Sequence, residues 1–327
     1  MRRTQTQVLE RLERDTLRVI DGMVDEQGLR LKGLWEGTKS RLKMYIQHEY
    51  SQDFRGEPWN FSDAVRRGTF ERIQKRTHDI LHEFYEQSAG SFSEHLKRLR
   101  RESTLRAAWM LDQVTPGSMS ARLPMGFALK EAAQLGETQW NDRWGAWLDS
   151  YQISLTNNLR MGALNASTPE DAADEVEATR PGSPTADMWS ALERIHRHES
   201  YSIYASAQGD VAKANEQFNL VEIWQTRYYK RVCDICEENR GLTREEATDD
   251  IPAHPNCECF WRVVPASWAQ LMRSGNADER EIAKAMDAAD EVPDMMLVMN
   301  DQGELVGAAT VEFGDWISDK MKVLTGG

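Results

Sequence analysis

The sequence predicts a mainly α-helical protein with one small β element. Apolar residues recur at helical spacing through most of its 327 residues, whereas two short stretches, 218–224 and 260–264, are rich in β-branched and aromatic residues. A chain of this length exceeds what one hydrophobic core usually organises. We therefore expect an extended helical arm or bundle over residues 1–115, a helical domain with a stapled hairpin and loop over residues 119–265, and an acidic appendage over residues 266–327.

Two apolar seams define the expected arm. The spacing 3, 4, 3, 4 of Leu9, Leu12, Thr16, Val19 and Met23 returns between residues 70 and 84, as in helices that pack lengthwise on one another. The arm should therefore hold several long helices separated by short breaks. The expected breaks are Gly28, Gly33 and Gly37, the connection Arg55–Pro58, a capping box formed by Ser91 and Glu94, and the turn Thr115–Ser118.

Large aromatic residues mark the first helix of the second region. Trp140, Trp144, Trp147 and Tyr151 step by 4, 3 and 4, which places them on one helix face. A stripe of this kind is more often core than a platform for a cofactor or for bases, so we expect it to be buried. The elements expected next are a short helix starting near Pro169, a turn at 180–184 and a helix at about 186–207.

The acidic appendage is predicted to combine a helix, a hairpin and an amphipathic turn. Helical periodicity covers residues 277–290, and the stretch from Met295 to Phe313 suggests a hairpin around Asn300–Gly303, followed by an amphipathic turn near Trp316. The appendage shows no pair of nucleophile and base, which favours a binding role over a separate enzyme.

Charge is distributed unevenly along the chain, whose net charge is −13. Residues 1–106 hold 21 basic and 17 acidic side chains, net +4, whereas residues 107–327 hold 19 and 36, net −17. The acidic part would repel polyanions, so general or sequence-specific nucleic-acid binding by the whole protein is not expected. Two basic clusters are either contact surfaces or solvated helix faces: Arg66, Arg67, Arg72, Lys75 and Arg76, and Lys97, Arg98, Arg100 and Arg101.

Neither export nor membrane insertion is expected. The chain has no run of eighteen apolar residues, and its first ten residues lack the apolar core of a secretory signal. We therefore expect synthesis in the cytosol and no membrane partner.

All four cysteines fall within 27 residues, and a histidine lies among them. A CxxC hairpin with Cys233 and Cys236 faces a loop with His254, Cys257 and Cys259, which offers five donors where zinc needs four in a tetrahedron. Four thiolates, or three with His254, would leave no open position for water, so we expect one structural zinc ion and no catalysis at it. Two disulfides are the alternative, although cytosolic synthesis favours reduced thiols.

The segments around these donors resemble a known family. After the CxxC pair comes Pro252–Cys259, which reads PAHPNCEC, and upstream stand Leu159–Gly162 and Arg197–Glu199. Together, over about residues 120–265, they resemble the head morphogenesis domain of the phage Mu minor head protein F family. The departures from the family pattern are Tyr229–Lys230 before the first cysteine, His198 in the helix motif and Glu258 between the last two cysteines.

The resemblance implies a minor structural protein of a tailed-phage head, without enzymatic activity. Such a protein would be present in several copies near the portal vertex and the capsid interior, and would act in procapsid assembly, DNA packaging or delivery. The implied partner is the portal protein, with the major capsid or scaffolding protein as a further candidate. The implied location is the host cytoplasm during assembly and then the virion.

One alternative is a zinc-stabilised nucleic-acid-binding or nuclease module. A nuclease of the ββα-metal type would need further histidines near the second cysteine pair, but only His254 lies in the loop. The acidic charge of residues 107–327 also opposes phosphate binding.

The other alternative is a metallopeptidase built on a helix. His78 and His82 share a helix face and could bind zinc, but the residue after His78 is Asp79, where a general-base glutamate is expected. His196 and His198 could likewise be ligands, although packed or solvated histidines are more common.

Overall fold

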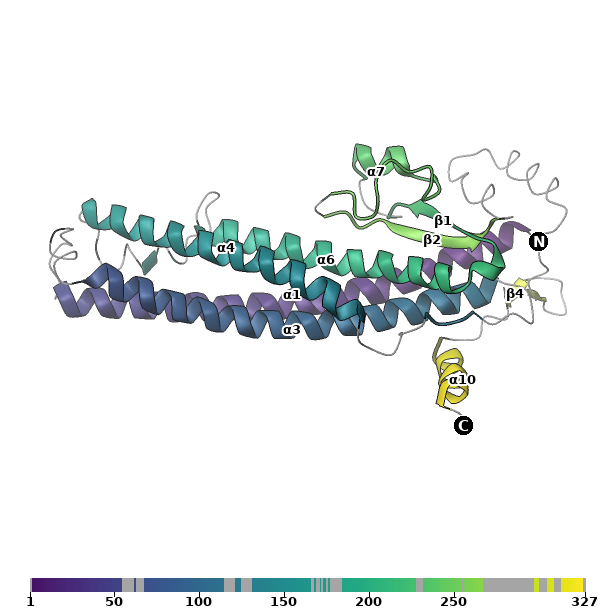
Figure 1. The fold of residues 1–327 in the computed structure, drawn as a ribbon, viewed down its shortest axis with the longest axis horizontal. Helices are drawn as coiled ribbons and strands as arrows, with labels where there is room; N and C mark the ends of the chain where they lie inside the picture. The colour runs from purple at the N-terminus through teal and green to yellow at the C-terminus, as the bar shows by residue number, and fades with distance from the viewer. Residues whose placement is uncertain are drawn as a thin grey trace. The chain divides into compact units, whose positions relative to one another are not determined.

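The protein is mainly helical, with short strands in two pairs (Figure 1). Its computed structural model describes residues 2–54, 62, 68–114, 121–124, 131–165, 168, 171, 173–174, 176, 184–227, 232–254, 256–266, 297–299, 305–308 and 313–325. The helices are α1 (Arg2–Phe54), α3 (Thr69–Val114), α4 (Glu131–Leu164), α6 (Pro184–Ala214), α7 (Asp234–Asn239) and α10 (Phe313–Thr325), with a 3-10 turn at Glu216–Phe218. The strands are β1 (Leu220–Gln225), β2 (Phe260–Pro265), β3 (Leu297–Met299) and β4 (Leu305–Ala308). The predicted fold class is therefore confirmed.

Helix α1 runs without interruption through the three glycines at which the sequence predicts breaks (Figure 1). A Cβ atom at Gly33 or Gly37 would meet nothing within 4 Å, so these glycines face open space. Each costs about 1 kcal/mol relative to alanine. The same turns bury Leu31, Trp35 and Leu42, whose burial contributes about 1.5–3 kcal/mol each. Burial outweighs the glycine cost, and the predicted breaks are wrong.

Helix α3 likewise continues past Ser91, where the sequence predicts that a capping box opens a new helix. Ser91 is buried, and its hydroxyl accepts a hydrogen bond at 3.0 Å from the side-chain amide of Gln27 in α1. The hydroxyl thus joins two helices instead of capping one, and the predicted cap is wrong. Despite their length, none of the described helices is apolar enough to cross a membrane.

Contacts divide the chain into two compact units, each assembled from separate segments. Unit 1 comprises Met1–Val24, Leu96–Ala132 and His198–Gly327, and unit 2 comprises Asp25–His95 and Ala133–Arg197. Helices α1, α3 and α6 each contribute residues to both units. The regions 1–115, 119–265 and 266–327 stay a prediction of the domain organisation.

Large aromatic side chains form the core of unit 2. Trp35 of α1 and Tyr151 of α4 meet edge to face, with ring centroids 5.3 Å apart. Trp144 and Tyr151 are buried, which confirms the predicted stripe at these positions, whereas Trp147 is 39% exposed. The side chain of Trp140 lies outside the described residues.

Unit 1 contains the β1–β2 ribbon. The strands pair antiparallel, from Leu220 opposite Pro265 to Gln225 opposite Phe260, and both predicted strands are confirmed. Residues of the ribbon join one apolar cluster with α1, α3, α6 and α10, and a second cluster that contains three of the cysteines. The ribbon therefore connects the helical core of unit 1 to the cysteine-rich loop.

The C-terminal strands and helix agree with the predicted hairpin and amphipathic turn. Strand β3 pairs antiparallel with β4, and α10 donates a hydrogen bond from Trp316 Nε1 to Asp112 at 2.7 Å. Thr168 and Asp171 exchange the hydrogen bonds of a helix N-terminus close to the predicted start. The predicted features that lie outside the described residues are the connection Arg55–Pro58, the turn Thr115–Ser118, Pro169, the turn residues 180–183, the helix 277–290 and the turn Asn300–Gly303.

Candidate metal centre

The segments that leave β1 and enter β2 carry the five predicted donors. Cys233 directly precedes α7, and Cys236 lies in the first turn of that helix. His254, Cys257 and Cys259 follow in the loop that leads into β2. Because β1 and β2 pair along their whole length, the two segments start from adjacent points of the ribbon. The CxxC pair therefore lies at a helix N-terminus, not in the expected hairpin.

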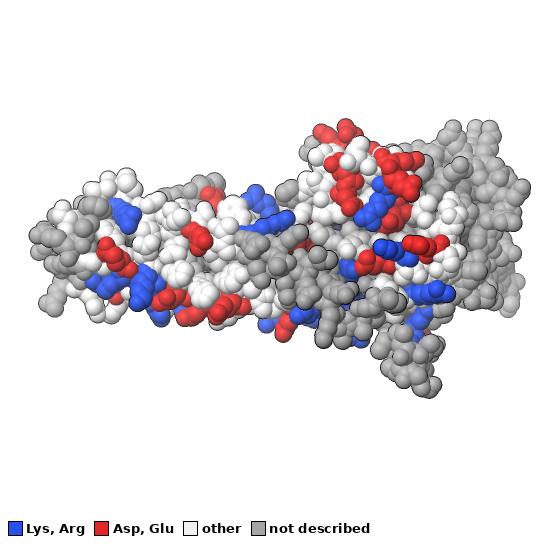
Figure 2. All heavy atoms as spheres, in the orientation of Figure 1, with Lys and Arg blue, Asp and Glu red and all other residues white. Residues whose placement is uncertain are grey.

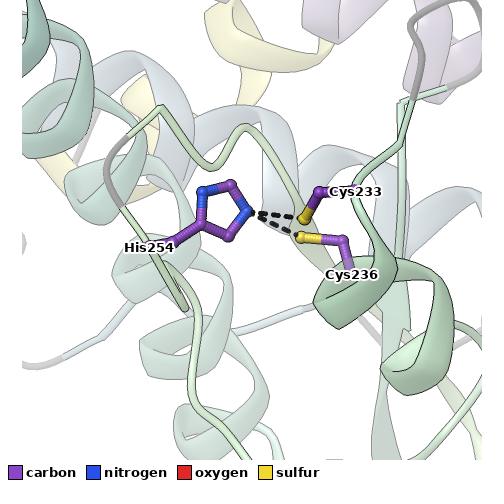
Figure 3. Close-up of side chains that lie close together, drawn as sticks. All are labelled: Cys233, Cys236 and His254. Carbon is purple, nitrogen blue, oxygen red and sulfur yellow. Dashed lines mark hydrogen bonds between the residues drawn. The ribbon is translucent and has the colours of Figure 1, made fainter.

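His254 points its Nε2 atom at both sulfurs of the CxxC pair (Figure 3). The nitrogen lies 3.0 Å from Cys233 Sγ and 3.2 Å from Cys236 Sγ, and Cys236 Sγ lies 3.7 Å from Cys257 Sγ. A tetrahedral ion with the bond lengths typical of zinc would hold two sulfurs about 3.8 Å apart, and a sulfur and a nitrogen about 3.5 Å apart. The distance between the two sulfurs thus matches a shared tetrahedral ion to about 0.1 Å, and the two distances to the nitrogen are shorter than that geometry by about 0.3 and 0.5 Å.

Two groups of three donors can each hold a metal ion. One consists of Cys233, Cys236 and His254, and the other of Cys236, Cys257 and Cys259, and the donor atoms of each group lie within 4.8 Å of one another. Because Cys236 belongs to both groups, an ion on its sulfur has four further donors close by for three remaining positions. All four cysteines are free thiols, so the alternative of two disulfides is not the arrangement in this structure.

Hydrogen bonds and burial separate the pKa values of the buried thiols. The pKa of Cys257 is lowered to about 5, chiefly because the thiol of Cys259 donates to its sulfur; burial opposes this, and backbone N–H groups add to it. The same hydrogen bond raises the pKa of Cys259, and burial raises the pKa of Cys236. Since metal ligation requires thiolates, Cys257 is the most readily ionised of these three donors.

Apolar side chains surround the buried sulfurs. Trp224 and Trp261 pack edge to face with ring centroids 5.4 Å apart, and with Ile251 they belong to the cluster that contains Cys236, Cys257 and Cys259. An apolar surrounding excludes water and strengthens the electrostatic interactions of an ion bound there.

Asn239 ties α7 to the loop that leads to His254. It is buried, its side-chain nitrogen donates to the carbonyl of Ile235 at 2.9 Å, and its side-chain oxygen accepts the N–H of Thr248 at 3.0 Å. The sequence alone does not identify this residue, because an asparagine at the end of a short helix is equally typical of a solvated turn.

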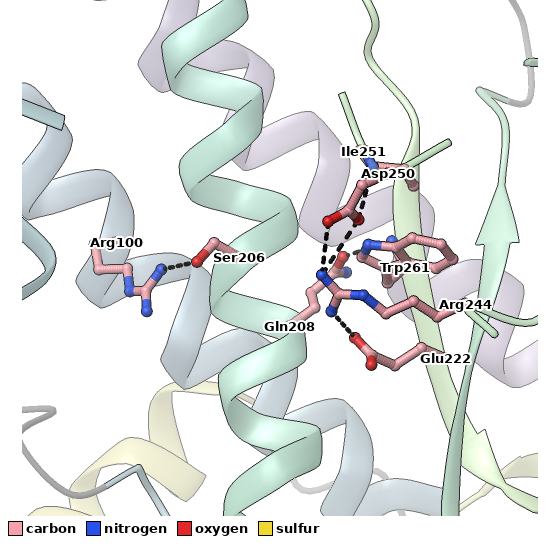
Figure 4. Close-up of polar contacts among 8 residues, drawn as sticks. All are labelled: Arg100, Ser206, Gln208, Glu222, Arg244, Asp250, Ile251 and Trp261. Atoms are coloured by element: carbon pink, nitrogen blue, oxygen red, sulfur yellow. Dashed lines mark hydrogen bonds and ion pairs between the residues drawn. The ribbon is translucent and has the colours of Figure 1, made fainter. Parts of the chain in front are cut away.

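A groove of about 1000 Å³ lies between α6, β1 and the loop after α7 (Figure 4). Arg244 lies in it and bonds Glu222 at 3.0 Å and Asp250 at 3.1 Å, with its guanidinium 5.2 Å from the Trp261 ring centroid. Burial raises the pKa of Glu222, and Arg244 opposes this shift. A Cβ atom at Gly209 of α6 would lie 2.9 Å from the Arg244 guanidinium, so the glycine permits this close approach. Arg244 therefore joins β1, the loop and α6.

Acidic side chains gather over the part of the surface that holds α7 (Figure 2). Residues 232–254 contain seven Asp or Glu and two Arg, net −5 with histidine neutral. A surface of this sign repels phosphate groups. The seven acidic residues, all exposed, are Asp234, Glu237, Glu238, Glu245, Glu246, Asp249 and Asp250.

The helical histidines of the metallopeptidase alternative do not form a comparable site. His78 and His82 lie exposed on α3 with ring centroids 6.2 Å apart, and His78 Nδ1 is 3.2 Å from the Gln152 side-chain oxygen. Within the part of the chain that the structure describes, the metal-binding groups of three donors include neither histidine.

The second histidine pair also lies outside those groups. His196 is buried, with its ring 5.5 Å from Phe92 and 5.6 Å from His95 between centroids. Burial, with His95 and Arg197 adding, lowers the pKa of His196 to about 3. A neutral, packed histidine is therefore the better description of His196.

The basic clusters are partly engaged in ion pairs. Arg72 pairs with Glu49 at 3.0 Å, and Arg100 pairs with Asp210 and donates to Ser206 at 2.8 Å (Figure 4). Arg66 and Arg67 lie outside the described residues. The ion pairs of Arg72 and Arg100 favour the interpretation of these clusters as solvated helix faces over that as contact surfaces.

Comparisons with known proteins found none that is similar to this chain. No protein-family model matches the chain, and no curated protein and no solved structure matches it. The resemblance of the cysteine-rich loop to the head morphogenesis domain therefore stays a prediction.

Proposed function

We propose that this protein is a minor structural component of a tailed-bacteriophage head, associated with the portal vertex and the capsid interior during procapsid assembly, DNA packaging or delivery. The observation that carries the proposal is the gathering of five donors at one place, in an order and spacing that resemble the head morphogenesis domain. The long helices of the chain support it, because exposed helix faces are surfaces on which partner helices dock. The five donors are Cys233, Cys236, His254, Cys257 and Cys259.

The ion that we propose for this site is zinc. Thiolate and imidazole donors suit zinc better than the hard cations calcium and magnesium, which take oxygen ligands. Small zinc sites contribute roughly 10–16 kcal/mol of apparent binding free energy, which is enough to order a loop that has little core of its own.

The role that we propose for the zinc is structural. A catalytic zinc keeps one position open for water or substrate. Here five protein donors compete for four positions, which supports a closed site. The acidic surface around α7 is unfavourable for a nucleic-acid substrate, so a scaffold for protein partners is the better interpretation.

Elemental analysis of the purified full-length protein tests the zinc site. We expect about one zinc per chain, consistent with one four-coordinate site. Cys236→Ser removes the donor that both groups share and should strongly weaken zinc binding. Ile235→Ser changes the exposed neighbour on the same helix and should retain it. Wild-type protein that is folded but free of metal would refute the proposal.

Purified heads of the phage whose genome encodes the chain test the assignment to the virion. Mass spectrometry should detect the protein at a few copies per head, and cross-linking should join it to the portal protein. The Cys236→Ser substitution should lower its incorporation, and Ile235→Ser should not. Heads that lack the wild-type protein would contradict the assignment, and duplex-DNA binding at physiological salt would favour the nucleic-acid-binding module instead.

A further inference from the structure

We infer that Glu258 couples metal binding in the cysteine-rich loop to the packing of the first turns of α1. The connection runs from Glu258 through Arg227 to Asp21, and it makes Glu258 a positioning residue between the donors and the helix. The inference rests on the proposed metal binding, and it adds a conformational consequence: loss of the ion loosens residues 9–24 of α1.

Glu258 stands between two of the donors. Its neighbours in the chain are Cys257 and Cys259, and its side chain is only 9% exposed. Its carboxylate lies 3.4 Å from the Nε atom of Arg227. An ion bound by either adjacent thiolate therefore restricts the backbone from which this carboxylate reaches Arg227.

Arg227 carries the connection onward to α1. It follows β1 by two residues, and its side chain is 3% exposed. Its Nη2 atom donates to Asp21 of α1 and, at 2.9 Å, to the hydroxyl of Tyr201 in α6. That hydroxyl in turn donates to Asp21 at 2.7 Å. One buried guanidinium thus holds two carboxylates, Asp21 and Glu258, that lie 237 positions apart in the chain.

Strand β2 makes a second connection to the same helix. Arg262, three residues after Cys259, forms two bonds of 2.6 Å to the carboxylate of Glu13, and both side chains are at most 5% exposed. Glu13 and Asp21 are eight residues apart, about 12 Å along a helix. The segment that leaves the metal site is therefore fastened to α1 at two points.

Through these contacts, metal binding in the cysteine-rich loop and packing of α1 depend on each other. Fixing the loop with an ion reduces the conformational entropy that must be lost when Glu258 meets Arg227. Buried charges in one network polarise and hold one another, so the placement of Arg227 in turn affects Asp21. Thermodynamic linkage is reciprocal: if metal binding favours α1 packing, α1 packing raises metal affinity by the same factor.

Zinc affinity of α1 variants tests this reciprocity in the full-length protein, by competition with a chromophoric chelator. Asp21→Asn is distant in sequence from every donor and should weaken zinc binding about tenfold, a loss typical of residues that support metal ligands. Asp15→Asn makes the same chemical change on the same helix, at an exposed ion pair with Arg18. The zinc affinity of this variant should stay within about twofold of the wild-type value.

A matched pair in the loop tests the other end of the connection. Glu258→Gln should weaken zinc binding to the same extent as Asp21→Asn. Glu237→Gln also lies beside a donor, Cys236, but its exposed carboxylate pairs with Arg240. The zinc affinity of this variant should stay close to the wild-type value.

Hydrogen exchange of residues 9–24 provides a direct readout of α1. In wild type, zinc should slow amide exchange in this segment relative to protein treated with chelator. In Glu258→Gln, zinc added at saturating concentration should leave the exchange of this segment nearly unchanged. Ile46→Val, a buried change in the same helix outside residues 9–24, controls for a general loss of stability and should preserve zinc affinity.

The outcomes separate this inference from the proposed function. Wild-type protein that binds no zinc would remove the proposed metal site itself. Wild-type protein that binds zinc, with Asp21→Asn equally tight and residues 9–24 indifferent to the ion, would overturn the inference and leave the metal site standing. Equal weakening by Ile46→Val and Asp21→Asn would also overturn it, because general stability would then explain both.

Discussion

The buried ion pair between Glu13 and Arg262 gives the most quantitative prediction for stability. The two side chains are 2% and 5% exposed and share two bonds of 2.6 Å. We consider three changes: Glu13→Leu, Arg262→Met and both together. Leucine and methionine keep much of the side-chain volume and remove the charge.

The expected magnitudes follow from the burial of both groups. At an effective dielectric constant of about 20, two unit charges about 4 Å apart attract by about 4 kcal/mol. Transfer of each ion from water costs several kcal/mol, so the pair as a whole contributes little net stability. Removing one partner leaves the other charge buried without its main counter-ion, and each single substitution should cost about 3–5 kcal/mol. The double substitution should be neutral or stabilising.

Equilibrium urea unfolding of the zinc-saturated protein, followed by tryptophan fluorescence, measures these differences. The double variant should be more stable than either single variant. A loss below about 1 kcal/mol for Glu13→Leu would show that the charge is not held in a low-dielectric site. A double variant whose loss equals the sum of the single losses would refute the description of the two residues as an interacting pair.

Three further predictions concern side chains away from the metal site, each measured by urea unfolding. Asn215→Ala removes three hydrogen bonds of 2.7, 2.8 and 2.8 Å from a buried side chain and should cost about 3 kcal/mol, whereas a loss under about 1 kcal/mol would contradict these bonds. The pKa of His196 is lowered to about 3 by burial, so below pH 6.5 the unfolded state takes up a proton that the folded state refuses. This proton uptake should lower the free energy of unfolding by about 2 kcal/mol between pH 7 and pH 5. His196→Gln should reduce that fall, whereas the control His82→Gln, at an exposed histidine, should not. Gly209→Ala should raise the free energy of unfolding by up to about 1 kcal/mol, because the better helix propensity of alanine outweighs the cost of shifting the partly exposed end of Arg244. A loss of stability above about 1 kcal/mol would mean that Arg244 cannot move.

Periodicity and residue type predicted the features that depend on neighbours in sequence. The 3 and 4 spacing located α1 and α3, although in α1 the predicted seam leaves the buried face at exposed Val19, where Leu17 and Ile20 are buried instead. The β-rich stretches located β1 and β2, and the spacing of the cysteines predicted that they gather. These features are encoded locally, or by a pair of strands that can meet in only one register.

The connection between the metal site and α1 could not be predicted in the same way. Asp21 and Glu13 are charged residues within a helix, and such residues are usually solvated. Glu13 is buried and Asp21 only 23% exposed, and the partners that hold them, Arg262 and Arg227, lie more than 200 positions later in the chain. The predicted break at Gly33 was wrong for a related reason: local propensity is weak compared with the burial of a long face.

The assembly of each unit from separated segments has a consequence for biosynthesis. Glu13 is added to the chain 249 residues before its partner Arg262, a delay of roughly 10–50 s at common translation rates. During that time a nascent chain already contains α1 and α3 but lacks the pieces that complete unit 1. A deletion of residues 1–115 would take material from both units at once. Shortened versions of this chain are best designed with their ends at the limits of the units: Val24 and Asp25, His95 and Leu96, and Arg197 and His198.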